Sequence, residues 1–145
     1  MSRKTRGMEW ATLAASFMGL VGCAHDPMTD PPPKGLSYLQ AVECAGLMSA
    51  LHKLGEPEGW TYDRRADVFA YWAEPLAPGG DFMLVSGAVG ESTTRFLARF
   101  PGLSLLEDAA ELKKKQEELR LAHMDAVYRC EQLSPAFDIV VVAGG

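Results

Sequence analysis

The sequence lacks a long apolar run and an excess of positive charge. Its apolar segment at residues 10–22 is 13 residues long, whereas a transmembrane helix needs about 20. Lysine and arginine total 14 against 19 aspartates and glutamates. This balance argues against non-specific nucleic-acid binding, which requires neutralisation of phosphates. It argues equally against docking on an anionic lipid surface through charge.

Motifs that carry chemistry are missing as well. The sequence contains no C-x-x-C-H, H-E-x-x-H, G-x-S-x-G, S-x-x-K or P-loop pattern. His52 and His123 lie near predicted helix stripes, and two histidines across a bundle could ligate haem or a metal. A single helical histidine near an apolar face is more often a boundary residue. We therefore predict no catalytic residues, no cofactor and no metal site.

The N-terminal segment has the pattern of an export signal. A positive region with Arg3, Lys4 and Arg6 precedes the apolar residues 10–22. The segment ends in Leu20-Val21-Gly22-Cys23, which resembles the lipobox of bacterial lipoproteins. The resemblance implies cleavage before Cys23, with diacylglycerol on its sulfur and an acyl chain on its amine. Ordinary cleavage after Ala24 is the alternative.

Lipidation would decide how the protein meets the membrane. One acyl chain binds a bilayer only marginally, whereas two or three anchor stably. In the resembled class the residue after the lipidated cysteine influences sorting, and here it is Ala24 rather than aspartate. The resemblance therefore implies a protein anchored in the bacterial envelope through lipid on Cys23. It favours the outer membrane, facing the periplasm, over the inner membrane.

The chain divides into four parts: a signal peptide (1–22), a proline-rich tether (23–35), a helical domain (36–134) and an extended tail (135–145). Four prolines in residues 24–35 exclude helix and central strand. A polyproline II tether of this length would reach on the order of 35 Å. The β-branched residues 139–142 favour an extended tail. We expect the tail to pack on the bundle; strand addition to a partner or a mobile end are the alternatives.

The domain is predicted to be all-α, a small up-down bundle of about four helices. The first helix should span 38–54, with Ser37 and Gln40 as a capping box and Gly55 at its end. The second should run from about 64 to 76.

The third helix should span 81–100 with Asp81 as its cap. Its glycines, Gly87 and Gly90, either let a neighbouring helix approach closely or break the segment in two; we favour one helix. The fourth helix should span 105–133, with Ser104 and Glu107 as a capping box.

Cysteine usage links the anchor to the fold. If Cys23 carries lipid, Cys44 and Cys130 remain as an even pair in an oxidising compartment, and a disulfide is the simple expectation. An antiparallel arrangement of the first and last helices brings the two positions together. Two separately buried thiols are the alternative.

Aromatic side chains are densest in residues 60–72, where Trp60, Tyr62, Phe69 and Trp72 could line a ligand groove or fill the core. The sequence therefore predicts a lipidated helical envelope protein that acts as a structural or protein-interaction module. Its partners would be the membrane, through Cys23, and an envelope protein, but not nucleic acid. The alternative is a small-ligand module, for an apolar or haem-like ligand, built on the aromatic region.

Overall fold

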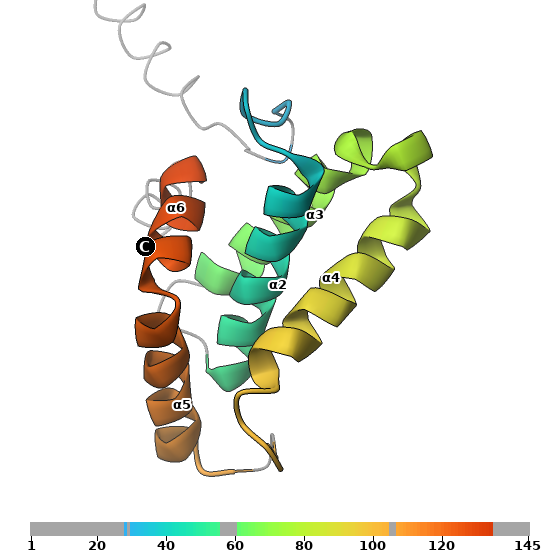
Figure 1. Ribbon diagram of the computed structural model, residues 1–145. Helices are drawn as coiled ribbons and strands as arrows, with labels where there is room; N and C mark the ends of the chain where they lie inside the picture. Colours follow the sequence, from blue (N-terminus) through green and yellow to red (C-terminus); the bar gives the residue numbers. More distant parts are fainter. Residues whose placement is uncertain (1–27, 29, 56–60, 105–106, 135–145) are drawn as a thin grey trace, which may run out of the picture.

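The computed structural model describes residues 28, 30–55, 61–104 and 107–134, which are helical with no strand among them. The elements are α2 (Tyr38–Leu54), α3 (Thr61–Leu76), the 3₁₀ helix η2 (Pro78–Gly80), α4 (Phe82–Leu97), α5 (Ala109–Ala122) and α6 (Met124–Leu133). The chain runs down α2, up α3, down α4 and up α5 and α6 (Figure 1). The predicted all-α class is confirmed, with five α-helices in place of about four. The predicted signal peptide and C-terminal tail lie outside the described residues.

α2 is the central helix. It buries ten of its 17 residues, namely Ala41, Val42, Cys44, Ala45, Gly46, Leu47, Met48, Ala50, Leu51 and Leu54. A helix that is apolar nearly all round must be covered on several sides. α3 and α4 pack against it, and α5 and α6 flank its remaining side (Figure 1). None of the helices in the described ranges is both long and apolar enough to cross a bilayer.

The ends of α2 form as local patterns predict. Gln40 N donates to Ser37 Oγ at 3.1 Å, and Ser37 N donates to Gln40 Oε1 at 3.0 Å, which completes the capping box. Gly55 ends the helix with a φ of 144°, a value that side-chain-bearing residues rarely adopt.

A close approach between two helices occurs at Gly46 of α2, and not at the glycines of α4. A Cβ on Gly46 would lie 2.2 Å from Ser92 Oγ and 3.0 Å from Thr93 N. α4 is one continuous helix, and a Cβ on Gly87 or Gly90 would meet nothing within 4 Å. The expectation that these two glycines admit a neighbouring helix is therefore wrong within the described chain.

The predicted fourth helix is two helices. Its backbone leaves helical geometry at His123 (φ −123°, ψ 33°), which separates α5 from α6. Ser104 does not cap it, because α5 begins only at Ala109 with Asp108 as its N-cap. The Glu107 carboxylate instead accepts a hydrogen bond from Lys115 Nζ, and this interaction lowers the pKa of Glu107.

Polar side chains attach α5 to the first two helices. The Gln116 amide donates to Leu51 O at 2.9 Å and to Gly55 O, carbonyls at the end of α2 that have no partner within the helix. Arg120 donates to the Tyr62 hydroxyl of α3. Burial raises the pKa of Tyr62, against the opposing effect of Arg120, so the phenol remains neutral near pH 7.

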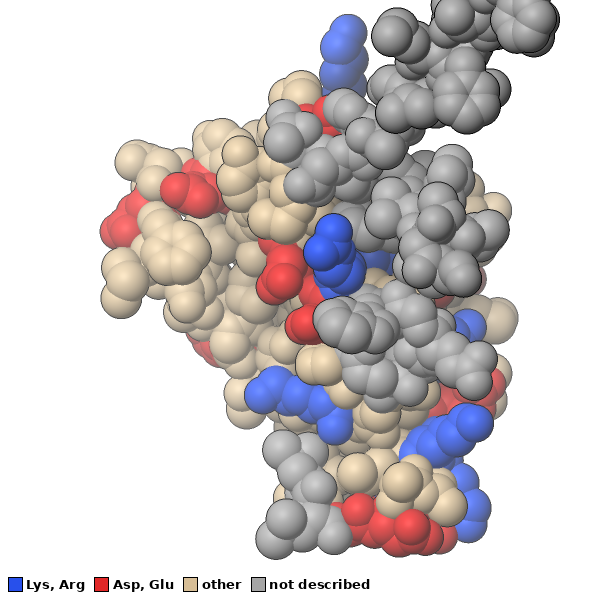
Figure 2. Space-filling view, turned by 180° about the vertical axis from the view of Figure 1, so that it is seen from behind, with Lys and Arg blue, Asp and Glu red and all other residues tan. Residues whose placement is uncertain are grey.

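Ion pairs gather on α5 as well. Arg99 Nε lies 3.2 Å from Glu118 Oε1, and Lys114 Nζ lies 2.9 Å from Glu111 Oε1. Seen from behind, basic and acidic side chains lie side by side at this lower end of the molecule (Figure 2). Exposed pairs of this kind contribute little to stability, typically below about 1 kcal/mol each.

Cys44 of α2 and Cys130 of α6 lie at disulfide distance, with Sγ atoms 2.09 Å apart and Cα atoms 5.6 Å apart. The two positions are separated by 86 residues. In the chain-entropy model, closing a loop of that length stabilises the fold by about 4.5 kcal/mol. Beside the pair, Arg65 Nε of α3 donates to Ser134 Oγ at 3.2 Å, and Ser134 Oγ donates to Cys130 O at 2.9 Å.

The described end of the predicted tether lies against the bundle. The Trp72 indole Nε1 donates to Asp30 O at 3.2 Å, and Leu36 is buried. Residues 30–35 were predicted to belong to the proline-rich tether; the hydrogen bond from Trp72 holds Asp30 against the domain. Fewer residues are therefore left to separate the bundle from Cys23.

The α2–α4 crossing predicts opposite effects for two glycine-to-alanine substitutions. Gly46→Ala should lower the free energy of unfolding by about 2 kcal/mol, because its Cβ would overlap Ser92. Gly87→Ala, which adds the same methyl group in open space, should raise it by up to about 1 kcal/mol through helix propensity. Urea denaturation followed by circular dichroism measures both. A Gly46→Ala protein as stable as Gly87→Ala would contradict the close crossing.

Candidate binding groove

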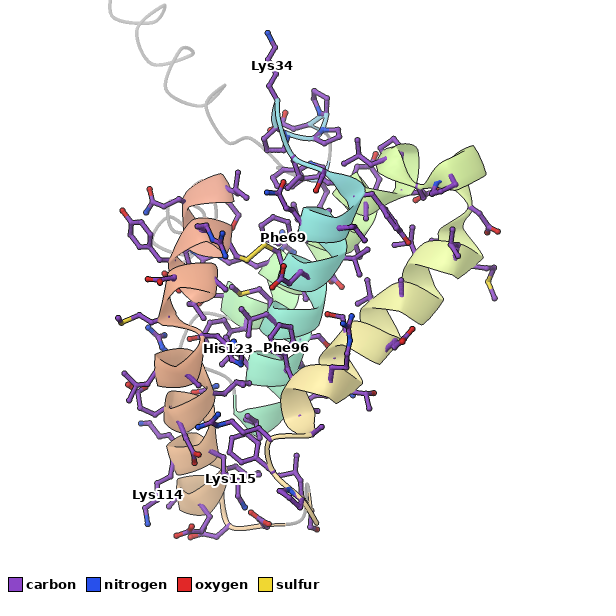
Figure 3. All side chains as sticks on the ribbon, in the orientation of Figure 1. Lys34, Phe69, Phe96, Lys114, Lys115 and His123 are labelled. Carbon is purple, nitrogen blue, oxygen red and sulfur yellow. A yellow bond between two sulfur atoms is a disulfide. The ribbon has the colours of Figure 1, made fainter. Side chains whose placement is uncertain are left out.

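A groove opens on the face of the bundle between α2, α4 and the junction of α5 with α6. It has a volume of about 460 Å³ and is lined by Leu39, Val42, Glu43, Ser92, Arg95, Phe96 and His123. We call it the α2–α4 groove. Figure 3 shows Phe96 and His123 meeting midway along the molecule, in front of α2.

The deepest lining residues of the groove are one apolar and one polar side chain. Val42 of α2 and Ser92 of α4 are both buried, and Ser92 lies at the close crossing of the two helices at Gly46. Phe96 and His123, both half-buried, form one wall. Their rings contact edge to face, with centroids 5.0 Å apart and planes at 85°. The break in the helix at His123 therefore coincides with this ring contact.

The rim carries charges of both signs. Glu43 of α2 and Arg95 of α4 are exposed, and neither forms an ion pair or hydrogen bond within the described part of the chain. Leu39 lies beside them with 76% of its surface exposed. Apolar side chains bordered by polar and charged ones are the usual composition of a protein–protein contact surface.

The three described side chains of the possible aromatic groove are packed in the core, and Trp72 also lines part of a second hollow. Tyr62, Phe69 and Trp72 are 2%, 0% and 4% exposed and fill the core. Phe69 and Trp72 pack edge to face with ring centroids 5.5 Å apart. Trp60 lies outside the described residues. Core filling, which the sequence left open as the other interpretation, accounts for the three described side chains.

The two histidines considered as a ligand pair have different surroundings. His52 Nε2 lies 3.8 Å from Asp63 Oδ1 of α3, whereas His123 lines the α2–α4 groove. Within the residues that the structure describes, no group of three or more histidine, cysteine, aspartate or glutamate side chains could hold a metal ion.

The sequence held only a weak signal for the groove. Arg95 and Arg99 are one turn apart on α4, a spacing that fits either an anion site or a solvated face. The structure separates them, because Arg99 pairs with Glu118 while Arg95 lines the groove. Glu43 is the only acidic residue of α2, and Leu39 lies off the buried stripe of that helix. An acidic residue and a leucine outside the buried stripe of α2 are therefore the features of the sequence that could have indicated the rim of the groove.

A second hollow of about 620 Å³ lies where the tether meets the bundle. It is lined by Asp30, Pro31, Pro32, Tyr71, Trp72, Glu74, Pro75 and Gly80. The chain's own N-terminal segment forms one side of this hollow, so the segment, α3 and η2 are neighbours in space.

Comparisons of the chain with protein families, with curated proteins and with solved structures find no match.

Proposed function

We propose that the protein is a lipid-anchored helical protein of the bacterial envelope that binds another envelope protein through the α2–α4 groove. The observation that carries the binding role is the combination of apolar lining residues, among them an exposed leucine, with two charges that have no partner within the described chain. A protein segment that inserts an apolar side chain and pairs with Glu43 and Arg95 would complete this surface.

The openness of the rim favours a protein over a small molecule. Sites for small ligands enclose most of the ligand surface, but Leu39, Glu43 and Arg95 stand exposed around this groove. The alternative of a small-ligand module depended on the aromatic residues 60–72. Tyr62, Phe69 and Trp72 of that region are packed in the core, which leaves that alternative with less support than the groove.

The anchor is proposed from the sequence. Leu20-Val21-Gly22-Cys23 supplies the lipobox pattern, and acylation of Cys23 would hold the bundle at the outer membrane on its periplasmic side. Export also agrees with a cysteine pair at disulfide distance, because disulfides persist in oxidising compartments.

Substitution of Cys23 tests the anchor. A Cys23→Ser precursor should move from the detergent phase to the aqueous phase in Triton X-114 partitioning, because the acyl chains have no attachment site. The Cys44→Ser variant, which also removes one thiol, is the control and should remain in the detergent phase. Equal partitioning of Cys23→Ser and the unsubstituted protein would contradict lipidation.

Site-specific crosslinking in native cells tests the binding role. A photoreactive amino acid at Leu39 should give one discrete protein adduct, whereas the same group at Leu121, an exposed leucine of α5, should not. Arg95→Glu should reduce the Leu39 adduct by about tenfold, because it replaces the positive charge of the rim with a negative one and so reverses its electrostatic complementarity to the partner.

Lys113→Glu is the matched charge reversal for this experiment. Lys113 is exposed on α5, away from the groove, and forms no ion pair within the described residues. The Lys113→Glu substitution should leave the Leu39 adduct unchanged. Identical adducts at positions 39 and 121, or equal effects of the two reversals, would argue against the groove as the binding surface.

A further inference from the structure

The upper end of the bundle exposes a cluster of large apolar side chains. Phe82, Met83 and Leu84, in the first turn of α4, are 60%, 74% and 46% exposed, and Tyr71 of α3 is 45% exposed. We call these four residues the α4 tip. Phe82, Val85 and Val89 recur at helical spacing, which favours one apolar stripe facing the core. Instead α4 is tilted against α2, and its first turn lies away from the central helix (Figure 1).

The charges near the α4 tip are acidic. Asp81 caps α4 through its Oδ1, which accepts from Met83 N at 2.9 Å, and Glu74 lines the adjacent hollow. From behind, the outer end over η2 and the start of α4 is tan and red, without blue (Figure 2). From Cys23 onward the chain has 11 basic and 18 acidic residues. This surface therefore does not suit a phosphate-rich or otherwise anionic partner.

The N-terminal segment reaches the bundle at the same end. Asp30 O accepts the Trp72 indole hydrogen bond, and Asp30, Pro31 and Pro32 share one hollow with Tyr71 and Gly80. Gly80 ends η2, two residues before Phe82. The point where the chain joins the domain and the α4 tip are thus parts of one surface.

The remaining chain is too short to carry this surface far from an anchor at Cys23. Seven residue steps separate Cys23 from Asp30, and a fully extended chain spans at most about 3.6 Å per residue. Asp30 therefore lies within about 25 Å of a lipidated Cys23. The headgroup layer of a bilayer extends several ångströms beyond its hydrocarbon core, which shortens the distance from Asp30 to the nearest lipid atoms.

We propose that the α4 tip is a membrane-contact surface, at which Phe82 and Met83 insert between the headgroups of zwitterionic phospholipids. The inference rests on the proposed lipid anchor at Cys23, which brings the tip to the bilayer. Apolar and aromatic side chains partition into this interfacial layer without basic residues beside them. The bundle then has a defined orientation, with the α4 tip and the tether on the lipid.

Depth-dependent quenching of fluorescence tests this contact in the full lipidated protein. A Phe82→Trp variant is reconstituted in phosphatidylcholine vesicles with or without brominated acyl chains, and the signal of the unsubstituted protein is subtracted. The brominated lipid should reduce the added fluorescence about twofold. Leu121→Trp, an equally exposed position on α5, should show no reduction. Thermal unfolding should verify that both variants fold.

The outcomes separate the two proposals. Flotation of the vesicles on a density gradient shows whether the protein is bound to them. If the protein floats but the Phe82→Trp variant is quenched no more than the Leu121→Trp variant, the membrane contact is overturned and the anchor stands. If the protein floats no better than its Cys23→Ser form, the anchor is overturned and the contact with it. If the indole of the Phe82→Trp variant is shielded equally without vesicles, a second copy covers the α4 tip, which also overturns the membrane contact.

Discussion

The pairing of Cys44 with Cys130 is the interaction on which the rest of the arrangement depends. α6 is only ten residues long and buries only Val127 and Cys130, and isolated helices of this length are marginal in water. Its own apolar surface is therefore too small to hold it in place. The link from Cys130 to Cys44 of α2 therefore holds α6 against the bundle. Arg65 and Ser134 form hydrogen bonds beside this link.

Fixing α6 also fixes one wall of the α2–α4 groove. His123 lies one residue before α6, and its ring meets Phe96 of α4. α2 serves all of these contacts at once: Cys44 faces α6, Gly46 admits α4, and Leu39, Val42 and Glu43 line the groove. Substitutions at Cys44 or Gly46 should therefore alter the groove although neither residue lines it.

Local patterns predicted the parts of the fold that local physics decides. The capping box of Ser37 and Gln40 and the cap at Asp81 need only a few neighbouring residues, and both were recognised. The break at His123 was missed, because good helix formers continue through it and the ring contact comes from α4. The sequence left open whether Tyr62, Phe69 and Trp72 line a groove or fill the core, since composition alone does not show which face of α3 meets α2. The α2–α4 groove joins three separate elements, and tertiary packing alone creates it.

The proposed lipid anchor at Cys23, the pairing of Cys44 with Cys130 and the proposed orientation of the bundle on the membrane depend on one another. With the tether and the α4 tip on the lipid, the groove would extend from the first turns of α2 to Phe96 and His123, which lie midway along the bundle (Figure 3). Intact-mass spectrometry of the mature protein extracted from native membranes tests this account most directly. The account predicts a chain of residues 23–145 that carries lipid on Cys23 and takes up alkylating reagent at two cysteines only after reduction. An unlipidated chain that begins at His25, or two cysteines that are alkylated without reduction, would contradict it.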